Sequence, residues 1–347
     1  MKRIVKVFLL FGILVILLFL FIRFYLPSFL IYNHPVDSEV VVIESWISAY
    51  EVERIADYLK QDPEARCIVV GKHYIAEVEE SADMNSHNYN KKDIGQKGIW
   101  LLTNSSLTFN LSGLTVLQSG DSVTISVTAK GTEAAGYFPY FNIVVNGHFV
   151  KGYFVKEEFN DFYIKIPTPE KGIESLCLRF TNDIFTGNED RNLSIHSVKI
   201  GGFTILATPE NVAETEEQTK ETTGFNSQSE EVAQYLVGLG VNSQKMTTLD
   251  FKPVICNQTL ASAKALKEYF EKKQISNLNV LSSGFHSRRT WFTYQKVLGP
   301  SLKVGVIYYP PVNYSQQNLH KTFSGYLYLL NEFVSYVVNW LSLSSED

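Results

Sequence analysis

The chain begins with a long apolar stretch, residues 4–24. It is interrupted at three positions, Lys6, Gly12 and Arg23. An apolar helix of that length spans a bilayer core of about 30 Å. Because bulky residues continue to the end of the stretch and no small-residue cleavage site follows, the pattern favours an uncleaved anchor at residues 1–26 over a signal peptide. Basic residues precede the stretch, which predicts a cytoplasmic N-terminus and a periplasmic or extracellular body.

Two segments of the body alternate continuous apolar runs with amphipathic helical patterns. The runs are typical of strands buried on both faces and lie at residues 40–43, 67–70, 246–249, 278–281 and 304–308. Helical spacing follows at residues 48–60, 230–239, 259–272 and 323–343, and after residue 286. The first helix begins with a capping box, Ser48 and Glu51. The last is long and apolar but carries Glu332, so it is expected to pack against the domain rather than cross the membrane. This βαβ order predicts a parallel sheet in an α/β domain made of residues 36–80 and 228–345.

Between these segments the pattern changes to short alternating strands, over residues 97–206. Strands are expected at residues 107–111, 123–129, 141–145, 162–166, 176–180 and 193–200. The dipeptide Asn146-Gly147 predicts a tight hairpin turn. Short strands with no helix between them predict an antiparallel sandwich. The polar segments 81–96 and 207–227 are expected to be linkers on either side of it.

Polar side chains follow the ends of the predicted parallel strands, where open α/β sheets bind ligands. In chain order they are Glu44, Trp46, Gly71, Thr259, Ser262, Ser283, His286, Arg288 and Arg289. A Ser-Ser-Gly turn that opens a helix carrying two arginines suits an anion, because backbone N–H groups and guanidinium groups both bind phosphate. A solvated helix face is the alternative for the arginines. His286 is the candidate acid/base and Glu44 its candidate partner. The sequence contains no Gly-x-Ser-x-Gly elbow, dinucleotide fingerprint or Walker loop.

The α/β segments resemble a known bacterial family. The resemblance is carried by VVIESW, NQTLASAKALKEYF, SSGFHSRRTWFTYQKVLG and KVGVIYYPP. In this order the segments are similar to the ElyC/SanA/YdcF family. The resemblance implies a Rossmann-like three-layer fold, often behind one membrane anchor, and a role in envelope biogenesis. Ser45 stands where the family has a glycine, which leaves an altered or inactive pocket as an alternative.

The β-rich region carries a second resemblance. Its segment FTNDIFTGNEDRNLSIHSVKIGG, residues 180–202, concentrates oxygen ligands of the kind that calcium prefers. The segment GYFPY, residues 136–140, offers aromatic rings to a sugar. Together they resemble the calcium-dependent xylan-binding carbohydrate-binding modules. The resemblance implies a jelly-roll-like module with metal ligands at Asp183, Asp190, Glu189 and Asn192. It implies carbohydrate contacts at Tyr137, Tyr140 and Asn182. An acidic turn with local side-chain caps is the alternative.

We therefore expect a membrane-anchored envelope protein whose β-rich module binds carbohydrate, with Ca²⁺ as the candidate cofactor. The α/β domain is expected to bind or process an anionic envelope-glycan precursor, and a non-enzymatic glycan receptor or scaffold is the alternative. The expected partners are a glycan and the lipid bilayer. A net charge of −5 gives no basic footprint for nucleic acid. Three cysteines without metal-ligand spacing predict neither a disulfide framework nor a metal site.

Overall fold

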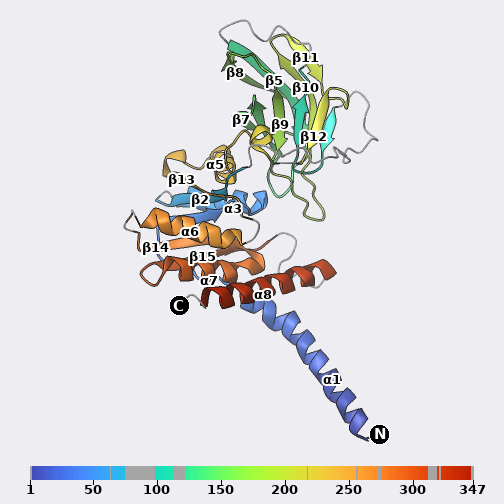
Figure 1. The fold of residues 1–347 in the computed structure, drawn as a ribbon. Coiled ribbons are helices and arrows are strands. Elements are labelled where there is room, and N and C mark those ends of the chain that lie inside the picture. The colour runs from blue at the N-terminus through green and yellow to red at the C-terminus, as the bar shows by residue number, and fades with distance from the viewer. Residues whose placement is uncertain are drawn as a thin grey trace. The chain divides into compact units, whose positions relative to one another are not determined.

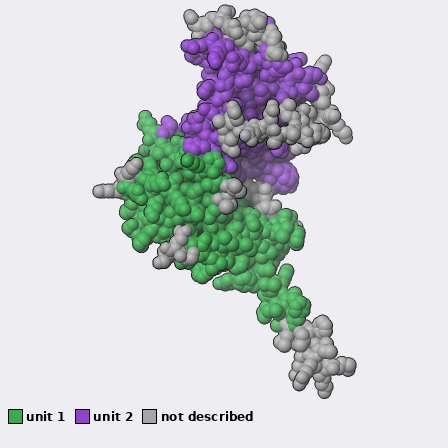
Figure 2. Space-filling view, in the orientation of Figure 1, with its two compact units in different colours: residues 1–47, 61–70, 244–347 green, residues 48–60, 71–243 purple. Residues whose placement is uncertain are grey.

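The chain forms two compact units. The computed structural model describes residues 2–62, 64–74, 98–111, 122–216, 218–254, 257–271, 273, 275–311, 319 and 322–344. Unit 1 comprises Met1–Ile47, Gln61–Val70 and Gln244–Asp347. Unit 2 comprises Ser48–Lys60 and Gly71–Ser243 (Figure 2). Each unit is therefore assembled from segments that are distant in the sequence.

The N-terminal part of unit 1 is helical. It consists of α1 (Lys2–Leu20), a π-helical stretch (Phe21–Tyr25) and α2 (Leu26–Leu30) (Figure 1). Within it, Phe11–Leu30 has a mean hydropathy of 2.4 and is the one helix of the described residues that is long and apolar enough to cross a membrane. A signal sequence has the same character, so membrane anchoring stays a prediction.

A five-stranded sheet follows, in the order β13-β2-β1-β14-β15 (Figure 1). Its strands are β1 (Val40–Glu44), β2 (Arg66–Lys72), β13 (Met246–Phe251), β14 (Asn277–Ser283) and β15 (Lys303–Tyr309). The pairs β1–β2, β1–β14 and β14–β15 are parallel. The five predicted strands and the parallel pairing of these three pairs are confirmed.

The helical elements of unit 1 after β13 are α6 (Gln258–Phe270), a 3₁₀ turn (Gly284–His286), α7 (Ser287–Leu298) and α8 (Phe323–Ser344). Helices α6 and α7 cover the strands, and α8 packs on α7 and α2 instead. A short 3₁₀ turn, Ser243–Lys245, precedes β13. Leu266 of α6 and Tyr294 of α7 share one core with Val42 and Val280 of the strands. The Rossmann-like layering itself stays a prediction.

Unit 2 is rich in β structure and contains two further five-stranded sheets. One has the order β11-β10-β5-β8 with β3 paired to β10, and the other has the order β12-β4-β9-β6-β7. The strands are β3 (Ile99–Leu101), β4 (Ser106–Phe109), β5 (Ser122–Gly131), β6 (Tyr140–Val145), β7 (His148–Phe154), β8 (Asn160–Pro167), β9 (Leu176–Phe180), β10 (Leu193–Ile200), β11 (Phe203–Leu206) and β12 (Val212–Thr215). Ile125 and Val127 of the first sheet share a core with Phe141 and Ile143 of the second. The strands expected in this region are all present, and the jelly-roll-like sandwich stays a prediction.

Local turn signals are confirmed in unit 2. Asn146 and Gly147 join β6 to β7 with positive φ angles of 50° and 71°, as the hairpin turn requires. The helix α3 (Ala49–Gln61) begins with the expected capping box. The Ser48 amide donates to Glu51 at 2.8 Å, and the Glu51 amide donates to the Ser48 hydroxyl at 3.4 Å.

The segment 207–227, expected to be a linker, is structured. It contributes β12, which pairs with β4, and the one-turn helix α4 (Lys220–Thr223). A polar strand at a sheet edge lacks the apolar alternation of an internal strand, so the sequence pattern did not predict β12. Helix α5 (Gln228–Gly238) follows. The other expected linker, 81–96, lies outside the described residues.

Candidate functional site

The first candidate cluster lies where β1 ends in unit 1. Glu44, the last residue of β1, is fully buried. Its Oε1 accepts a hydrogen bond from the Tyr294 hydroxyl at 3.2 Å. Its Oε2 lies 3.6 Å from Nε2 of His286 and has no hydrogen-bond partner among the described residues. A buried carboxylate oxygen without a full hydrogen bond is costly, so this position is poised for a proton or a polar group.

His286 connects three elements of unit 1. It precedes α7, and its side chain is 15% exposed. Its Nε2 also lies 3.2 Å from the Thr259 hydroxyl, near the start of α6. Its Nδ1 lies 3.3 Å from Oε2 of Glu332 on α8. Glu332 additionally accepts bonds from Nε and an Nη of Arg289, at 3.1 and 3.3 Å.

The charges around His286 determine its protonation. Burial and Arg289 act to lower the pKa of His286, but the nearby carboxylates of Glu332 and Glu44 outweigh them, and the pKa lies above its ordinary value. Burial acts to raise the pKa of Glu332, yet His286 and Arg289 hold that pKa down at about 2. Burial and Glu44 raise the pKa of Tyr294. The imidazole is therefore biased towards its charged form, as a general acid requires.

The structure brings together several, but not all, of the predicted residues of unit 1. Ser262 joins the cluster through a 2.5 Å bond between its hydroxyl and that of Tyr294. Arg289 joins it through Glu332. Arg288 instead donates Nε to the Phe29 carbonyl, and its guanidinium lies 4.4 Å from the Phe29 ring centroid.

The remaining predicted residues lie elsewhere in their elements. Trp46 packs edge-on against Phe251 in the core, at 6.1 Å between ring centroids. Ser283 is the last residue of β14, and Gly71 lies within β2. Tyr294 was not predicted from the sequence as a site residue, and Glu332 was not given a role in the site. The signal for Glu332 was present, because it is the one charged residue in the last helix and a lone charge in an apolar helix requires a partner.

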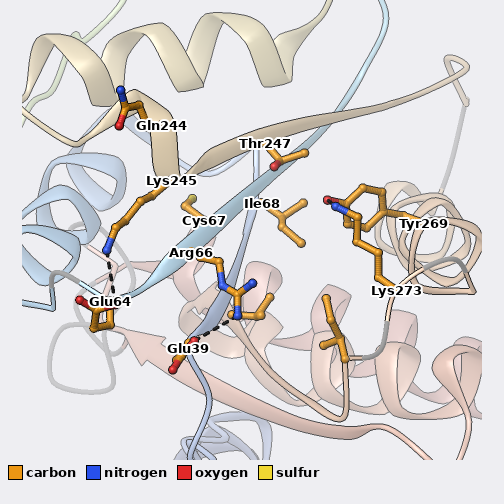
Figure 3. A pocket seen from close by; sticks show the side chains of 12 residues that line it. Glu39, Glu64, Arg66, Cys67, Ile68, Gln244, Lys245, Thr247, Tyr269 and Lys273 are labelled. Atoms are coloured by element: carbon orange, nitrogen blue, oxygen red, sulfur yellow. Dashed lines mark hydrogen bonds and ion pairs between the residues drawn. The ribbon is translucent and has the colours of Figure 1, made fainter.

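A cavity of about 360 Å³ lies at the opposite, amino ends of the strands (Figure 3). Four of its charged side chains are paired: Arg66 bonds Glu39 at 3.1 Å, and Lys245 lies 3.8 Å from Glu64. Lys273 donates to the Tyr269 hydroxyl at 2.6 Å. Arg66 and Lys245 therefore already have carboxylate partners, and the cavity carries no candidate residue of the predicted site.

The second candidate cluster lies in the loop before β10 of unit 2. Phe185 pairs with Asp190 in an antiparallel bridge, and the adjacent pair is linked by a 3.0 Å bond between backbone groups. The bridge holds the two arms of the loop together, and Asp190 is close enough to Asp183 for its charge to act on that carboxyl. One side-chain oxygen each of Asp183 and Asn192 is buried without a hydrogen-bond partner among the described residues. Burial, followed by the Asp190 charge, raises the pKa of Asp183 to about 6.

These donors fit a calcium ion in part. Calcium takes six to eight oxygen ligands, and Asp183, Asp190 and Asn192 offer oxygen donors that include the two orphaned atoms. Glu189 is engaged differently, because its carboxylate accepts the Ala135 amide at 2.8 Å. Among the described residues no group of three or more acidic, histidine or cysteine side chains converges. If these three side chains held a calcium ion, they would supply only part of its shell, and backbone, water or ligand oxygens would have to complete it.

A buried ion pair fastens this loop. Arg191 and Glu53 of α3 are both fully buried and form a two-pronged pair at 2.5 and 3.1 Å. The remaining donors of Arg191 reach backbone carbonyls, of Tyr137, Asn182 and Ala134. All five guanidinium donor contacts are thus used. Neither Arg191 nor Glu53 was identified from the sequence, because the pair forms only in the folded unit.

Three residues expected to contact carbohydrate take part in this packing. Asn182 is fully buried, accepts the Tyr140 amide at 2.6 Å and donates to the Tyr235 hydroxyl. Tyr140 is 2% exposed, and its ring lies 5.0 Å from that of Tyr235. Tyr137 is half-buried and donates its hydroxyl to Asp57 of α3 at 3.1 Å. Of the three, Tyr137 retains the greatest access to solvent.

Comparisons with known proteins support carbohydrate binding. Residues 124–215 match the family model described as a Ca-dependent, xylan-binding carbohydrate-binding module, CBM60. This match covers the acidic loop, β10 and β12 within unit 2. The resemblance of the α/β segments to the ElyC/SanA/YdcF family stays a prediction.

Other comparisons add little. No curated protein matches the chain. A solved structure, the Glycosylation Associate Protein (Gap123) complex from Streptococcus agalactiae, is 12% identical. The alignment covers 76% of this chain and 88% of that one, with a TM-score of 0.20. A likeness at that TM-score carries no argument about fold or function.

Proposed function

We propose that this protein is a membrane-anchored glycan-binding protein of the cell envelope. Unit 2 binds carbohydrate at the acidic loop, and calcium is held by Asp183, Asp190 and Asn192. The observation that carries the proposal is the coincidence of the CBM60 match with the loop that holds two orphaned, buried oxygens. Calcium bound there would offer open coordination positions to sugar hydroxyls. The chain's own part is to supply these oxygens and to keep the loop rigid through Arg191.

Calcium-dependent xylan binding tests this proposal. Xylo-oligosaccharide titrations of the full chain are run in calcium and in EDTA, beside a panel of other glycans. Asp183→Asn keeps the side-chain shape and removes the charge, so binding in calcium should weaken by at least about tenfold. Asp161→Asn is the matched control, because Asp161 lies outside the loop and accepts bonds from Thr128 of β5 and Tyr163 of β8. Glycan binding that is equal in EDTA removes the metal from the proposal, and binding to no glycan removes the module's role.

We further propose that unit 1 binds or processes an anionic envelope-glycan precursor at the His286 cluster. The support is a partly exposed imidazole held between two carboxylates and a threonine hydroxyl, with its pKa raised. His286 would donate a proton, and Glu44 would hold the imidazole in place. Arg289 would reach an anion only by sharing its bonds to Glu332. Arg288, bonded to the Phe29 carbonyl, is the weaker candidate for that role.

Activity and binding distinguish this proposal from a non-enzymatic scaffold. Lipid-linked and soluble sugar phosphates are incubated with the full chain, and product formation and binding are measured separately. His286→Gln should abolish turnover while leaving substrate binding within about threefold. Arg289→Lys should weaken binding instead. Binding without turnover by the unaltered protein favours the scaffold, and neither binding nor turnover refutes the role of unit 1.

The proposed topology has the apolar helix across the bilayer, the N-terminus in the cytoplasm and the body in the periplasm or outside the cell. Its support is the apolar helix Phe11–Leu30 and the basic residues that precede it. Resistance to carbonate extraction, together with protease access to the body from the outer side of the membrane, is the expected result. Release of a soluble body after cleavage near Tyr25 would instead identify a signal sequence.

A further inference from the structure

Helix α8 exposes an uninterrupted apolar stripe. Large apolar side chains recur along it at spacings of three and four residues, which place them on one helical face. They are Phe323, Leu327, Leu330, Val334, Val338 and Leu341, with Trp340 beside them. Their exposure is large, reaching 77% at Phe323 and 58% at Val334. Contiguous apolar surface of this kind marks an interaction site in a soluble or peripheral domain.

The one charged residue of α8 and one of its two asparagines are turned inwards, while Ser324, Asn331 and Ser342 are exposed. Glu332, the only charged residue of the helix, is buried and bonded to Arg289 and His286. Asn339 is buried as well and donates to the Thr293 hydroxyl at 3.1 Å. A surface helix in water has the reverse arrangement, with its apolar face in the core and its charges outside. The orientation of α8 is therefore suited to an apolar surrounding on its outer side.

That outer side begins beside the end of the candidate membrane span. The span ends at Leu30 in α2. Leu26 and Leu30 share a buried cluster with Leu329 of α8. The rings of Phe29 and Tyr336 meet edge to face, with centroids 5.5 Å apart. Figure 1 shows α8 in red beside the end of the blue N-terminal helix. A span that leaves the bilayer at Leu30 would therefore bring α8 to the bilayer surface.

We infer that α8 is an interfacial helix that lies in the membrane surface with its apolar stripe among the lipids. The lack of any exposed charge on the helix and the contact with α2 select lipid as the occupant. Trp340 would lie at the level of the head groups, where tryptophan is enriched. The helix cannot also cross the bilayer as a second span, because Glu332 and Asn339 are held inside unit 1. This inference rests on the proposed anchoring and is independent of glycan binding.

Quenching of Trp340 by lipid tests the inference. The full chain is reconstituted in phosphatidylcholine vesicles with and without bromine on the acyl chains. The difference between the unaltered protein and Trp340→Phe isolates Trp340 from the other three tryptophans. Brominated lipid should reduce the Trp340 emission by about twofold, because an interfacial side chain reaches the upper acyl region. Aqueous iodide should have little effect on the same difference signal.

Two variants and one control separate the possible outcomes. Val334→Ser/Leu341→Ser removes apolar groups from the exposed stripe and should reduce lipid quenching while leaving the far-UV spectrum unchanged. Carbonate-resistant association of both proteins with the vesicles reports the span separately, so a failure of anchoring is recognised as such. With anchoring intact, quenching by iodide but not by lipid overturns the inference. Protection of Trp340 from both quenchers also overturns the inference if Val338→Cys forms disulfide-linked dimers that the unaltered protein does not form. That result identifies a second copy of the chain as the occupant of the stripe.

Discussion

The buried Glu53–Arg191 pair gives the sharpest stability prediction. Glu53→Gln leaves the Arg191 guanidinium without a counter-charge in a fully buried site, since both side chains have no more than 1% exposure. It also weakens the 2.5 Å bond from the Tyr235 hydroxyl. Removing one partner of a buried pair costs about 3–5 kcal/mol of unfolding free energy. In a unit of this size each kcal/mol lowers Tm by about 2–4 °C, so the unfolding midpoint of unit 2 should fall by about 6–20 °C.

Differential scanning fluorimetry of the full chain in detergent measures this effect. The matched control is Glu39→Gln, because Glu39 pairs with Arg66 at the surface with both side chains more than 60% exposed. An exposed pair contributes about 0–1 kcal/mol, so that variant should melt within about 4 °C of the unaltered protein. The double variant Glu53→Leu/Arg191→Met should be more stable than Glu53→Gln, because no charge remains buried. A fall of less than about 2 °C for Glu53→Gln, or a double variant less stable than the single, would refute the reasoning.

Other predictions follow from the same kind of contact. The pKa of Glu332 is about 2, so the stability that its charged form contributes is lost as pH falls from 4.5 towards 2. The pKa of His286 is raised, so the stability that its charged form contributes is lost as pH rises from 6.5 through the folded pKa. The Tm difference between the unaltered protein and Glu332→Gln should accordingly be largest between these limits, and a flat difference across pH would contradict the pairing. Asn257 caps α6 with φ at 58°, so Asn257→Ala should lower the unfolding free energy by about 2 kcal/mol, because it loses the cap and disfavours the left-handed backbone. Asn257→Gly should lower it less, since glycine adopts that backbone freely, and thermal melting measures both. Burial raises the pKa of Cys67 and Cys177, so mass spectrometry after treatment with a thiol reagent should find both unmodified until the protein unfolds.

Local signals predicted the elements of this protein well. The Ser48–Glu51 capping box and the Asn146-Gly147 turn depend only on residues within a few positions of one another. The local sequence is therefore enough to predict both. The continuous apolar runs likewise identified the strands of the parallel sheet. Strand β12 was missed, because an edge strand has no apolar alternation to detect.

Tertiary partners were less predictable. Arg191 lies in the loop that the sequence analysis selected, yet its partner Glu53 is 138 residues away. Asn182 and Tyr140 have the side chains of a sugar site but lie in the core, where their polar groups complete the packing. Helix α8 was correctly expected to pack against the domain, but its amphipathic pattern could not reveal which side faces inwards. Such choices depend on neighbours that approach only after folding.

The Arg191 network also determines which part of this chain is portable. A transplant of residues 98–216 would carry Arg191 with its three carbonyl acceptors but without Glu53 or Tyr235. The Arg191 guanidinium would then be buried in the fusion protein without the carboxylate that neutralises its charge here. A graft of this region onto another scaffold should therefore include Ser48–Lys60 together with Gly71–Ser243, because the compact unit extends beyond both ends of the region that the family model matches.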